Sequence, residues 1–167
     1  MVSKEFIEGY ISGLIDGEAS FSVSIKLQRD LRCKVRLDPV FSITQEDRKV
    51  LELVQGYIKC GRIIKKPGQE HLWILIVDNL DELRYKLIPF IERNTLLIAK
   101  RKQFRIFKEI VTMLAERKYK LGCNDIKKLV VKAYELSNLS RKSRRRRSLS
   151  EILTLIPSGG GEAPGER

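Results

Sequence analysis

The sequence predicts a single α+β domain in which helices alternate with two antiparallel β-hairpins. Apolar residues recur at helical spacing over 3–17 and at every second position over 20–43, and a helix followed by a hairpin recurs over 47–77. A chain of 167 residues with 43% hydrophobic side chains is large enough to bury one core. We therefore expect one domain over residues 1–156 and a disordered tail, rich in Gly, over 157–167.

The first helix is expected to begin after the cap residue Ser3 and to end near residue 17. Two rows of apolar side chains with four-residue spacing should be buried along it: Phe6, Tyr10 and Leu14, and Ile7, Ile11 and Ile15.

A third face of this helix consists of Gly9, Gly13 and Gly17, with Ser12 beside them. Glycine inside a helix costs about 0.5–1 kcal/mol relative to alanine, so a row of glycines needs a physical reason. We interpret the row as a surface on which a second helix packs closely. Close packing against the sheet of the same chain is the alternative.

The first hairpin is predicted from alternation. Over 21–27 and 35–43 the odd-numbered residues are mainly apolar and the even-numbered ones mainly polar, with a polar turn over 29–32. One face of the hairpin should therefore be buried, and the other should be free to form hydrogen bonds.

The remaining elements follow from caps, turns and periodicity. A helix over 47–58 precedes a second hairpin, 62–66 and 72–77, whose turn is Lys66-Pro67-Gly68. Because 73–77 is apolar throughout, alternation does not set its register; Trp73 is interpreted as a core residue. Helices are expected over 79–91, 95–117, 124–137 and 148–156, capped by Asp78 or Asn79, by Thr95, by Asn124 or Asp125, and by Ser148.

The charge balance favours a polyanionic partner. Lys and Arg outnumber Asp and Glu by 33 to 21, so nucleic acid is expected before an anionic membrane surface, although many ribosomal proteins are equally basic. No apolar stretch is long enough to span a membrane, and the first residues do not form a signal peptide.

Cysteine and histidine usage narrows the chemistry and the compartment. The three cysteines, Cys33, Cys60 and Cys123, are odd in number and far apart, which favours a reducing compartment and no structural zinc. With a single histidine, His71, the chain lacks the residues of a zinc finger or a histidine-based nuclease. We expect an intracellular protein, in the cytoplasm of a prokaryote or in an organelle.

Two acids, Asp16 and Glu18, stand at the C-terminal end of the first helix. Each is unfavourable there by about 0.3–1 kcal/mol, because the helix end carries partial negative charge. A divalent cation would make the position favourable, since carboxylate and carbonyl oxygens are the ligands of Mg²⁺. Simple solvation of the two acids is the alternative.

The stretch YISGLIDGEASF resembles the motif of the LAGLIDADG homing endonucleases, with residues 11–19 in its nine positions and departures at Ser12, Gly17, Glu18 and Ala19. The resemblance covers about residues 3–156. It implies an αββαββα fold with an antiparallel DNA-binding saddle and C-terminal helices. It also implies a site-specific double-strand DNA endonuclease, intron- or intein-associated, that uses Mg²⁺ or Mn²⁺.

The resemblance also implies roles for single residues. Glu18 matches the metal-binding acid, with the Gly17 carbonyl as a companion ligand, and Asp16 matches an acid that is usually structural. Gln45 and Arg48 match residues that organise water near the scissile phosphate. Lys100 matches the catalytic lysine, with Lys102 as the alternative register.

Chains of this family with one motif act as homodimers, which makes Gly9, Ser12, Gly13 and Gly17 the expected dimer interface and the DNA site near-palindromic. The basic run 141–147, in a loop over 140–148, should grip the DNA backbone; a solvated charge run or a nuclear localisation signal is the alternative. The expected DNA contacts are Ser22, Ser24, Lys26, Gln28, Lys34, Arg36, Asp38, Ser42, Arg62, Lys66, His71, Arg141, Lys142, Arg144, Arg145, Arg146 and Arg147.

Two other functions stay open at this point. A protein of the same fold can bind intron RNA as a splicing maturase, or bind DNA as a regulator without cutting it. Retention of Glu18, Gln45 and Lys100 argues against the regulator.

Overall fold

The computed structural model describes residues 1–117, 120–140 and 145–158, and its helices and hairpins follow the expected order. Helix α1 (Lys4–Glu18) leads into strands β1 (Ser20–Leu27) and β2 (Val35–Gln45), and helix α2 (Arg48–Ile58) leads into β3 (Arg62–Lys66) and β4 (Gln69–Val77). The C-terminal helices are α3 (Leu80–Glu82), the π-helical turn η1 (Leu83–Leu87), α4 (Ile88–Asn94), α5 (Arg101–Glu116), α6 (Cys123–Asn138) and α7 (Leu149–Leu155). Most of the tail expected to be disordered, residues 159–167, lies outside the described residues.

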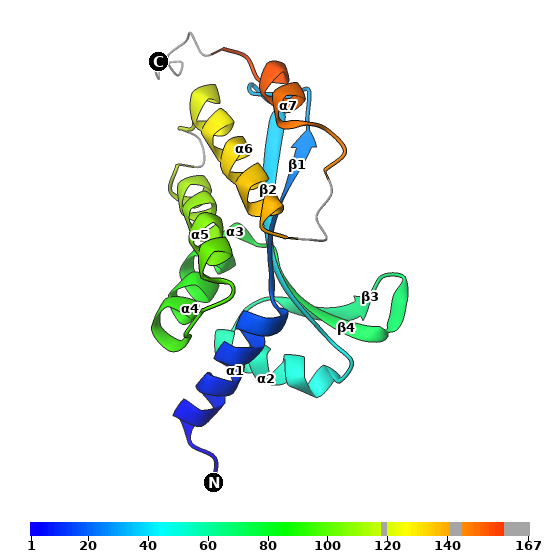
Figure 1. Cartoon of the computed structure of the whole chain (residues 1–167), viewed down its shortest axis with the longest axis vertical. Helices are drawn as coiled ribbons and strands as arrows, with labels where there is room; N and C mark the ends of the chain where they lie inside the picture. Colours follow the sequence, from blue (N-terminus) through cyan, green and yellow to red (C-terminus); the bar gives the residue numbers. More distant parts are fainter. Residues whose placement is uncertain (118–119, 141–144, 159–167) are drawn as a thin grey trace.

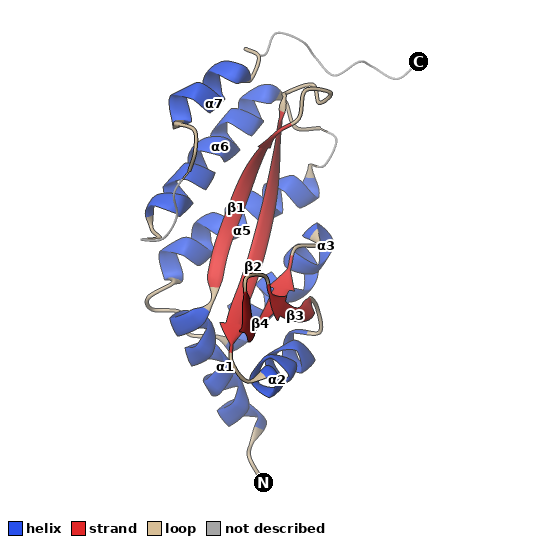
Figure 2. Ribbon diagram, turned by 90° about the vertical axis from the view of Figure 1, so that its right-hand side faces the viewer, coloured by secondary structure: helices blue, strands red, loops and turns tan. Residues whose placement is uncertain are grey.

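The four strands form one antiparallel sheet in the order β1-β2-β4-β3, so β2 and β4 join the two hairpins. Odd-numbered residues pair with odd-numbered ones, as in Phe21 with Phe41 and Ile43 with Leu75, and these side chains are buried. Helices α4, α5 and α6 lie along that side of the sheet (Figure 1). The even-numbered side chains point to the other side, which faces the viewer in Figure 2 and which we call the open face.

The core lies between the sheet and the C-terminal helices. Phe21 of β1 contacts Phe41 of β2 and both Phe104 and Phe107 of α5, with ring centroids 5.3–5.6 Å apart. Helix α2 packs against β2, β3 and β4, and it adds the buried side chains of Leu51, Val54 and Ile58 to the core. The helix end that carries Asp16 and Glu18 is thereby held at the edge of this core, because Ile11 and Ile15 of α1 are fully buried.

One apolar row of α1 is not buried as expected. Phe6 is 71% exposed and Tyr10 is 47% exposed, whereas Ile11 and Ile15 are buried. The two aromatic residues lie on a side of α1 that the described chain leaves partly uncovered, so helical spacing alone overestimated the width of the buried stripe.

The helix expected over 95–117 begins only at Arg101. Residues 95–100 form an irregular segment because α1 side chains bond to its backbone, as described below. The expected helix over 79–91 is capped by Asn79 but contains the π-helical turn η1, which ends two residues before Pro89, a residue with no N–H to donate. Helix α6 is capped by Gly122, whose N–H donates to Asp125.

The cysteines depart from the expectation that their number and spacing suggested. Cys33 and Cys123, 90 residues apart, form a disulfide that ties the turn of the first hairpin to the start of α6. Cys60 is free and buried, and burial raises the pKa of its thiol to about 12. No helix in the described residues is long and apolar enough to cross a membrane.

Candidate functional site

Asp16 is fully engaged by the backbone of the segment that precedes α5. Its carboxylate accepts hydrogen bonds from the N–H groups of Ile98 (3.0 Å), Ala99 (3.1 Å) and Lys100 (2.8 Å). Burial alone would raise the pKa of Asp16, but these three bonds outweigh it and hold the pKa below its usual value. Asp16 therefore has a structural role, and it places Lys100 beside the end of α1.

Ser12 acts on the same segment, one turn earlier. Its hydroxyl accepts from the N–H of Leu96 (2.6 Å) and donates to the carbonyl of Leu96 (3.3 Å). The side chain is only 7% exposed. Ser12 therefore does not lie on the glycine face, and its assignment to a dimer interface is corrected, because its polar group is used within the chain.

Glu18 differs from Asp16 in its exposure and in its partners. It is exposed, and it makes no hydrogen bond or ion pair with any residue that the structure describes. Gly17, directly before it, has open space where a side chain would be. A free carboxylate beside a helix-end carbonyl is a donor set that suits a hard divalent cation.

One chain supplies only part of such a cation site. Among the described residues, no group of three or more His, Cys, Asp or Glu side chains could hold a metal ion. Glu18 and the Gly17 carbonyl therefore fit a cation only if further oxygen ligands come from water, a bound phosphate or a second copy of the chain.

The glycine face of α1 is uncovered. A Cβ added at Gly9, Gly13 or Gly17 would meet no atom of the described chain within 4 Å. The exposed rings of Phe6 and Tyr10 lie on the same helix. The alternative that these glycines pack against the sheet of the same chain is therefore wrong.

The two candidate lysines have different surroundings. Lys100 is half-buried and immediately precedes α5, where its N–H is bonded to Asp16. Lys102 forms an ion pair with Glu135 of α6, with 3.8 Å between Nζ and Oε1. The structure brings Lys100, and not Lys102, to the end of α1.

Gln45 and Arg48 lie where β2 passes into α2. Gln45 is opposite Trp73 in the β2–β4 register. Arg48 donates to Glu52 at 2.8 Å and its guanidinium lies 4.8 Å from the centre of the Trp73 ring, while Lys65 lies 4.0 Å from it. Trp73 is thus a stacking platform for two cations, a role that the apolar run 73–77 did not reveal.

The open face of the first hairpin is polar, as expected. Ser22, Ser24 and Lys26 of β1 share it with Arg36, Asp38 and Ser42 of β2. Asp38 lies 2.7 Å from the Lys26 ammonium and 2.9 Å from the Arg36 guanidinium. Burial would raise the pKa of Asp38, but its bonds with these two cations lower it. Ser20 and Thr44 have the same parity, so alternation could have included them.

Several of the residues near the turns that were expected to contact DNA form bonds within the chain. Gln28 donates to Asp30 (3.2 Å), and the Lys34 ammonium donates to the carbonyl of Arg29 (2.7 Å). On the second hairpin, Arg62 lies on the open face and donates twice to Asp78, at 2.6 and 2.8 Å. Lys66 pairs with Gln69 across the register shift between β3 and β4, and His71, which lies within that irregular stretch of β4, is exposed.

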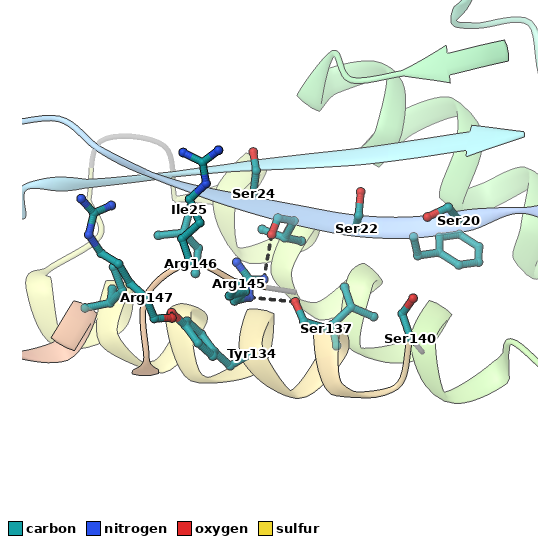
Figure 3. Close-up of a pocket in the computed structure, with 14 residues that line it drawn as sticks. Ser20, Ser22, Ser24, Ile25, Tyr134, Ser137, Ser140, Arg145, Arg146 and Arg147 are labelled. Carbon is teal, nitrogen blue, oxygen red and sulfur yellow. Dashed lines mark hydrogen bonds between the residues drawn. The ribbon is translucent and has the colours of Figure 1, made fainter. Parts of the chain in front are cut away.

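Arg145 is built into the fold and is not free to bind a ligand. Figure 3 shows it pointing between β1 and α6, where it donates to the carbonyls of Val23 (2.9 Å) and Ala133 (2.8 Å) and to the Ser137 hydroxyl (2.8 Å). It also stacks on Tyr134, at 4.6 Å. Burial lowers the pKa of Arg145, and the assignment of this residue as a DNA contact is corrected.

Its neighbours Arg146 and Arg147 are exposed, and they line the same cleft of about 540 Å³ as Ser20, Ser22 and Ser24. Figure 3 shows Arg146 extending past β1 toward the side to which Ser22 and Ser24 point. Arg141, Lys142 and Arg144 lie outside the described residues.

Known proteins are similar to this chain in sequence and in structure. A family model described as LAGLIDADG endonuclease matches residues 11–111. The chain is 53% identical over 163 residues to homing endonuclease I-ApeII of Aeropyrum pernix, and the aligned region spans 96% of this chain and 97% of that protein. It is 36% identical over 86 residues to DNA endonuclease I-CeuI of Chlamydomonas moewusii, or 50% of this chain and 39% of that protein.

Solved structures give the same result for the fold. The archaeal intron-encoded homing endonuclease I-Vdi141I, complexed with DNA, matches with a TM-score of 0.87 and 46% identity over 92% of this chain and 96% of that one. The homing endonuclease I-TnaI matches with a TM-score of 0.75 and 25% identity over 94% of this chain and 100% of that one.

Proposed function

Because this chain belongs to the LAGLIDADG endonuclease family, we propose that it is a homing endonuclease that hydrolyses both strands of a long, near-palindromic DNA site. It acts as a homodimer and uses a divalent cation, Mg²⁺ or Mn²⁺. The observation that carries the proposal is the contrast at the end of α1, where Asp16 is used by the fold and Glu18 is left free.

The dimer follows from the incomplete site and from the uncovered glycine face. At the end of α1 the described chain offers one free carboxylate, that of Glu18, and the glycines leave room for a second backbone to approach. Two copies of α1 related by a two-fold axis would bring two Glu18 side chains together. A two-fold axis in the protein requires approximate two-fold symmetry in the DNA site.

Each residue near the cation site has a separate task. Glu18 and the Gly17 carbonyl would hold the cation, which supplies a water of lowered pKa and neutralises charge on the phosphate. Lys100, placed by Asp16, would stabilise the negative charge that builds on the phosphate oxygens. Gln45 would orient water, and Arg48 would do so only after leaving Glu52.

The open face of the sheet would lie in the DNA major groove, where base edges are distinguishable. Lys26 and Arg36 offer donors there, while Asp38 sets their positions. Exposed Arg146 and Arg147, at the edge of β1, would contact backbone phosphates.

The experiment that tests this proposal is selection of cleaved sequences from a random double-stranded DNA library, in Mg²⁺ and in EDTA. The expected result is enrichment of one near-palindromic site, cut on both strands in Mg²⁺ only. If DNA sites are enriched by binding but are not cut, whichever divalent cation is supplied, the protein is instead a non-cleaving DNA-binding protein. Binding of the protein to intron RNA, and its effect on splicing of that RNA, test the maturase alternative.

A further inference from the structure

The open face of the second hairpin carries a cross-strand cluster of isoleucines. Ile74 of β4 lies opposite Thr44 of β2 and Ile64 of β3, and Ile76 lies opposite Ser42 and Arg62. All of these residues are even-numbered, so they share the face on which Ser22 and Ser24 point. We call Ile64, Ile74 and Ile76 the isoleucine patch.

The isoleucine patch does not belong to the hydrophobic core. On the opposite face of the same strands, Leu75 is fully buried, and Ile63 and Trp73 pack against the core. None of the three isoleucines of the patch packs against that core, and Ile64 is 36% exposed. Branched apolar side chains therefore line a sheet face whose other half carries serine, lysine and arginine.

The continuity of this face indicates what covers the patch. Strand β2 pairs with both β1 and β4, so the isoleucine patch and the polar readers Ser24, Lys26 and Arg36 lie on one uninterrupted surface. A ligand that crosses the polar half along the sheet continues onto the patch. The net charge of +12 favours nucleic acid as that ligand.

From this juxtaposition we propose that the isoleucine patch recognises thymine 5-methyl groups in the DNA major groove. The inference rests on the proposed function, in which the open face binds DNA. Thymine is the base whose major-groove edge carries an apolar group, so an apolar side chain there discriminates it from cytosine and from uracil. The first hairpin reads bases by hydrogen bonds, and the second reads methyl groups by contact.

The test replaces thymine by deoxyuridine in the selected site, one position at a time. The substitution removes only the methyl group and leaves base pairing unchanged. Binding is measured in Ca²⁺, so that cleavage does not interfere. We expect thymine to be enriched at one to three positions of each half-site, and deoxyuridine there to weaken binding about fourfold per position, the effect of one buried methyl group.

Matched variants assign the effect to the patch. Ile74→Ala should abolish the difference between thymine and deoxyuridine at one position of the half-site, whereas Lys65→Ala, on the opposite face of the neighbouring strand, should retain it at every position. Thermal unfolding of both variants checks that the fold persists, and the measurement on the unaltered protein stands even if Ile74→Ala does not fold.

The proposal is overturned if no thymine position of the half-site responds to deoxyuridine. It is also overturned if Ile74→Ala keeps the response and instead loses self-association, which would show that a second copy covers the patch. A protein that binds no DNA at all would refute the proposed function, a result distinct from site-specific binding without methyl sensitivity.

Discussion

Asp16 and Glu18 stand two residues apart at one helix end, and the fold treats them in opposite ways. Asp16 accepts three backbone N–H groups from residues 98–100, whereas Glu18 is exposed and unpartnered within the described chain. Both carboxylates sit at the negative end of the α1 dipole. For Asp16 the fold itself offsets that cost, and for Glu18 it does not.

This difference separates a positioning acid from a ligand. A carboxylate whose oxygens are already committed to backbone donors has little capacity left for a cation, and removing it affects the segment that it holds. A free carboxylate at an unfavourable position can be removed without loss to the fold. Substitution at the two positions should therefore affect different measurements.

The largest effect is expected at Glu18. Glu18→Gln keeps size and removes the charge that would hold the cation, so cleavage in Mg²⁺ should fall by about 10³-fold or more. DNA binding in Ca²⁺, measured by gel shift, and the melting temperature should stay close to those of the unaltered protein. Efficient cleavage by this variant would refute the metal assignment.

Breaking the dimer should remove the shared cation site of Glu18 and leave the hydrogen bonds of Asp16 within each chain unchanged. A leucine at position 13 meets no described atom within 4 Å of its Cβ, so Gly13→Leu should fold as a single chain but prevent close approach of a second α1. Sedimentation should report a monomer, and double-strand cleavage should fall by about 10²-fold or more. A dimer of unchanged affinity would place the interface elsewhere.

The lysine that Asp16 positions should matter more than its neighbour. Lys100→Ala should lower the cleavage rate by about 10²-fold, as removal of one charge-stabilising donor does. Lys102→Ala is the matched control, because Lys102 is paired with Glu135, and its effect should be a few-fold at most. Equal losses in single-turnover rates would contradict the choice of Lys100.

At Asp16 the expected loss is first one of stability. Asp16→Ala removes the acceptor of three backbone N–H groups, which should lower the free energy of unfolding by about 1–3 kcal/mol. Urea denaturation measures this, with Glu18→Gln as the control of unchanged stability. Should the two variants be equally stable, the structural role of Asp16 would be wrong.

The smallest effect is the pH dependence of stability that Asp16 contributes. Its pKa lies below the usual 3.8 in the folded state, so its stabilisation is present above about pH 3.8 and is lost as the pH falls through the folded-state pKa. The stability difference between the unaltered protein and Asp16→Asn should shrink over that acid range. A difference that is constant with pH would show that ionisation of Asp16 contributes nothing.

Much of the fold could be predicted because it depends on neighbours in the chain. The cap at Ser3, the alternation over 20–43 and the helix after Asp47 depend on hydrogen bonds and side-chain spacing within a few residues. The motif over 11–19 and its two acids, Asp16 and Glu18, were available in the same way, since these residues are consecutive in the chain.

The segment before α5 could not be predicted, since its partners lie about 84 residues earlier, on Ser12 and Asp16. Helical periodicity after Thr95 extends through this segment, but three backbone N–H groups bond to a carboxylate and not to helix carbonyls. Arg145 belongs to the same class: a basic run reads as exposed, yet one of its members caps the carbonyl of Val23 on an edge strand.

The sequence by itself determined the order of the helices and hairpins and the presence of two acids at the end of α1. Only the tertiary structure decided that Asp16 holds Lys100 in place, that Cys33 meets Cys123, and that Ile74 and Ile76 share a face with Ser24. The physical reason is the range of the interactions. Periodicity and capping act over a few residues, whereas strand register, disulfides and buried hydrogen bonds join segments whose separation leaves no mark on the local pattern.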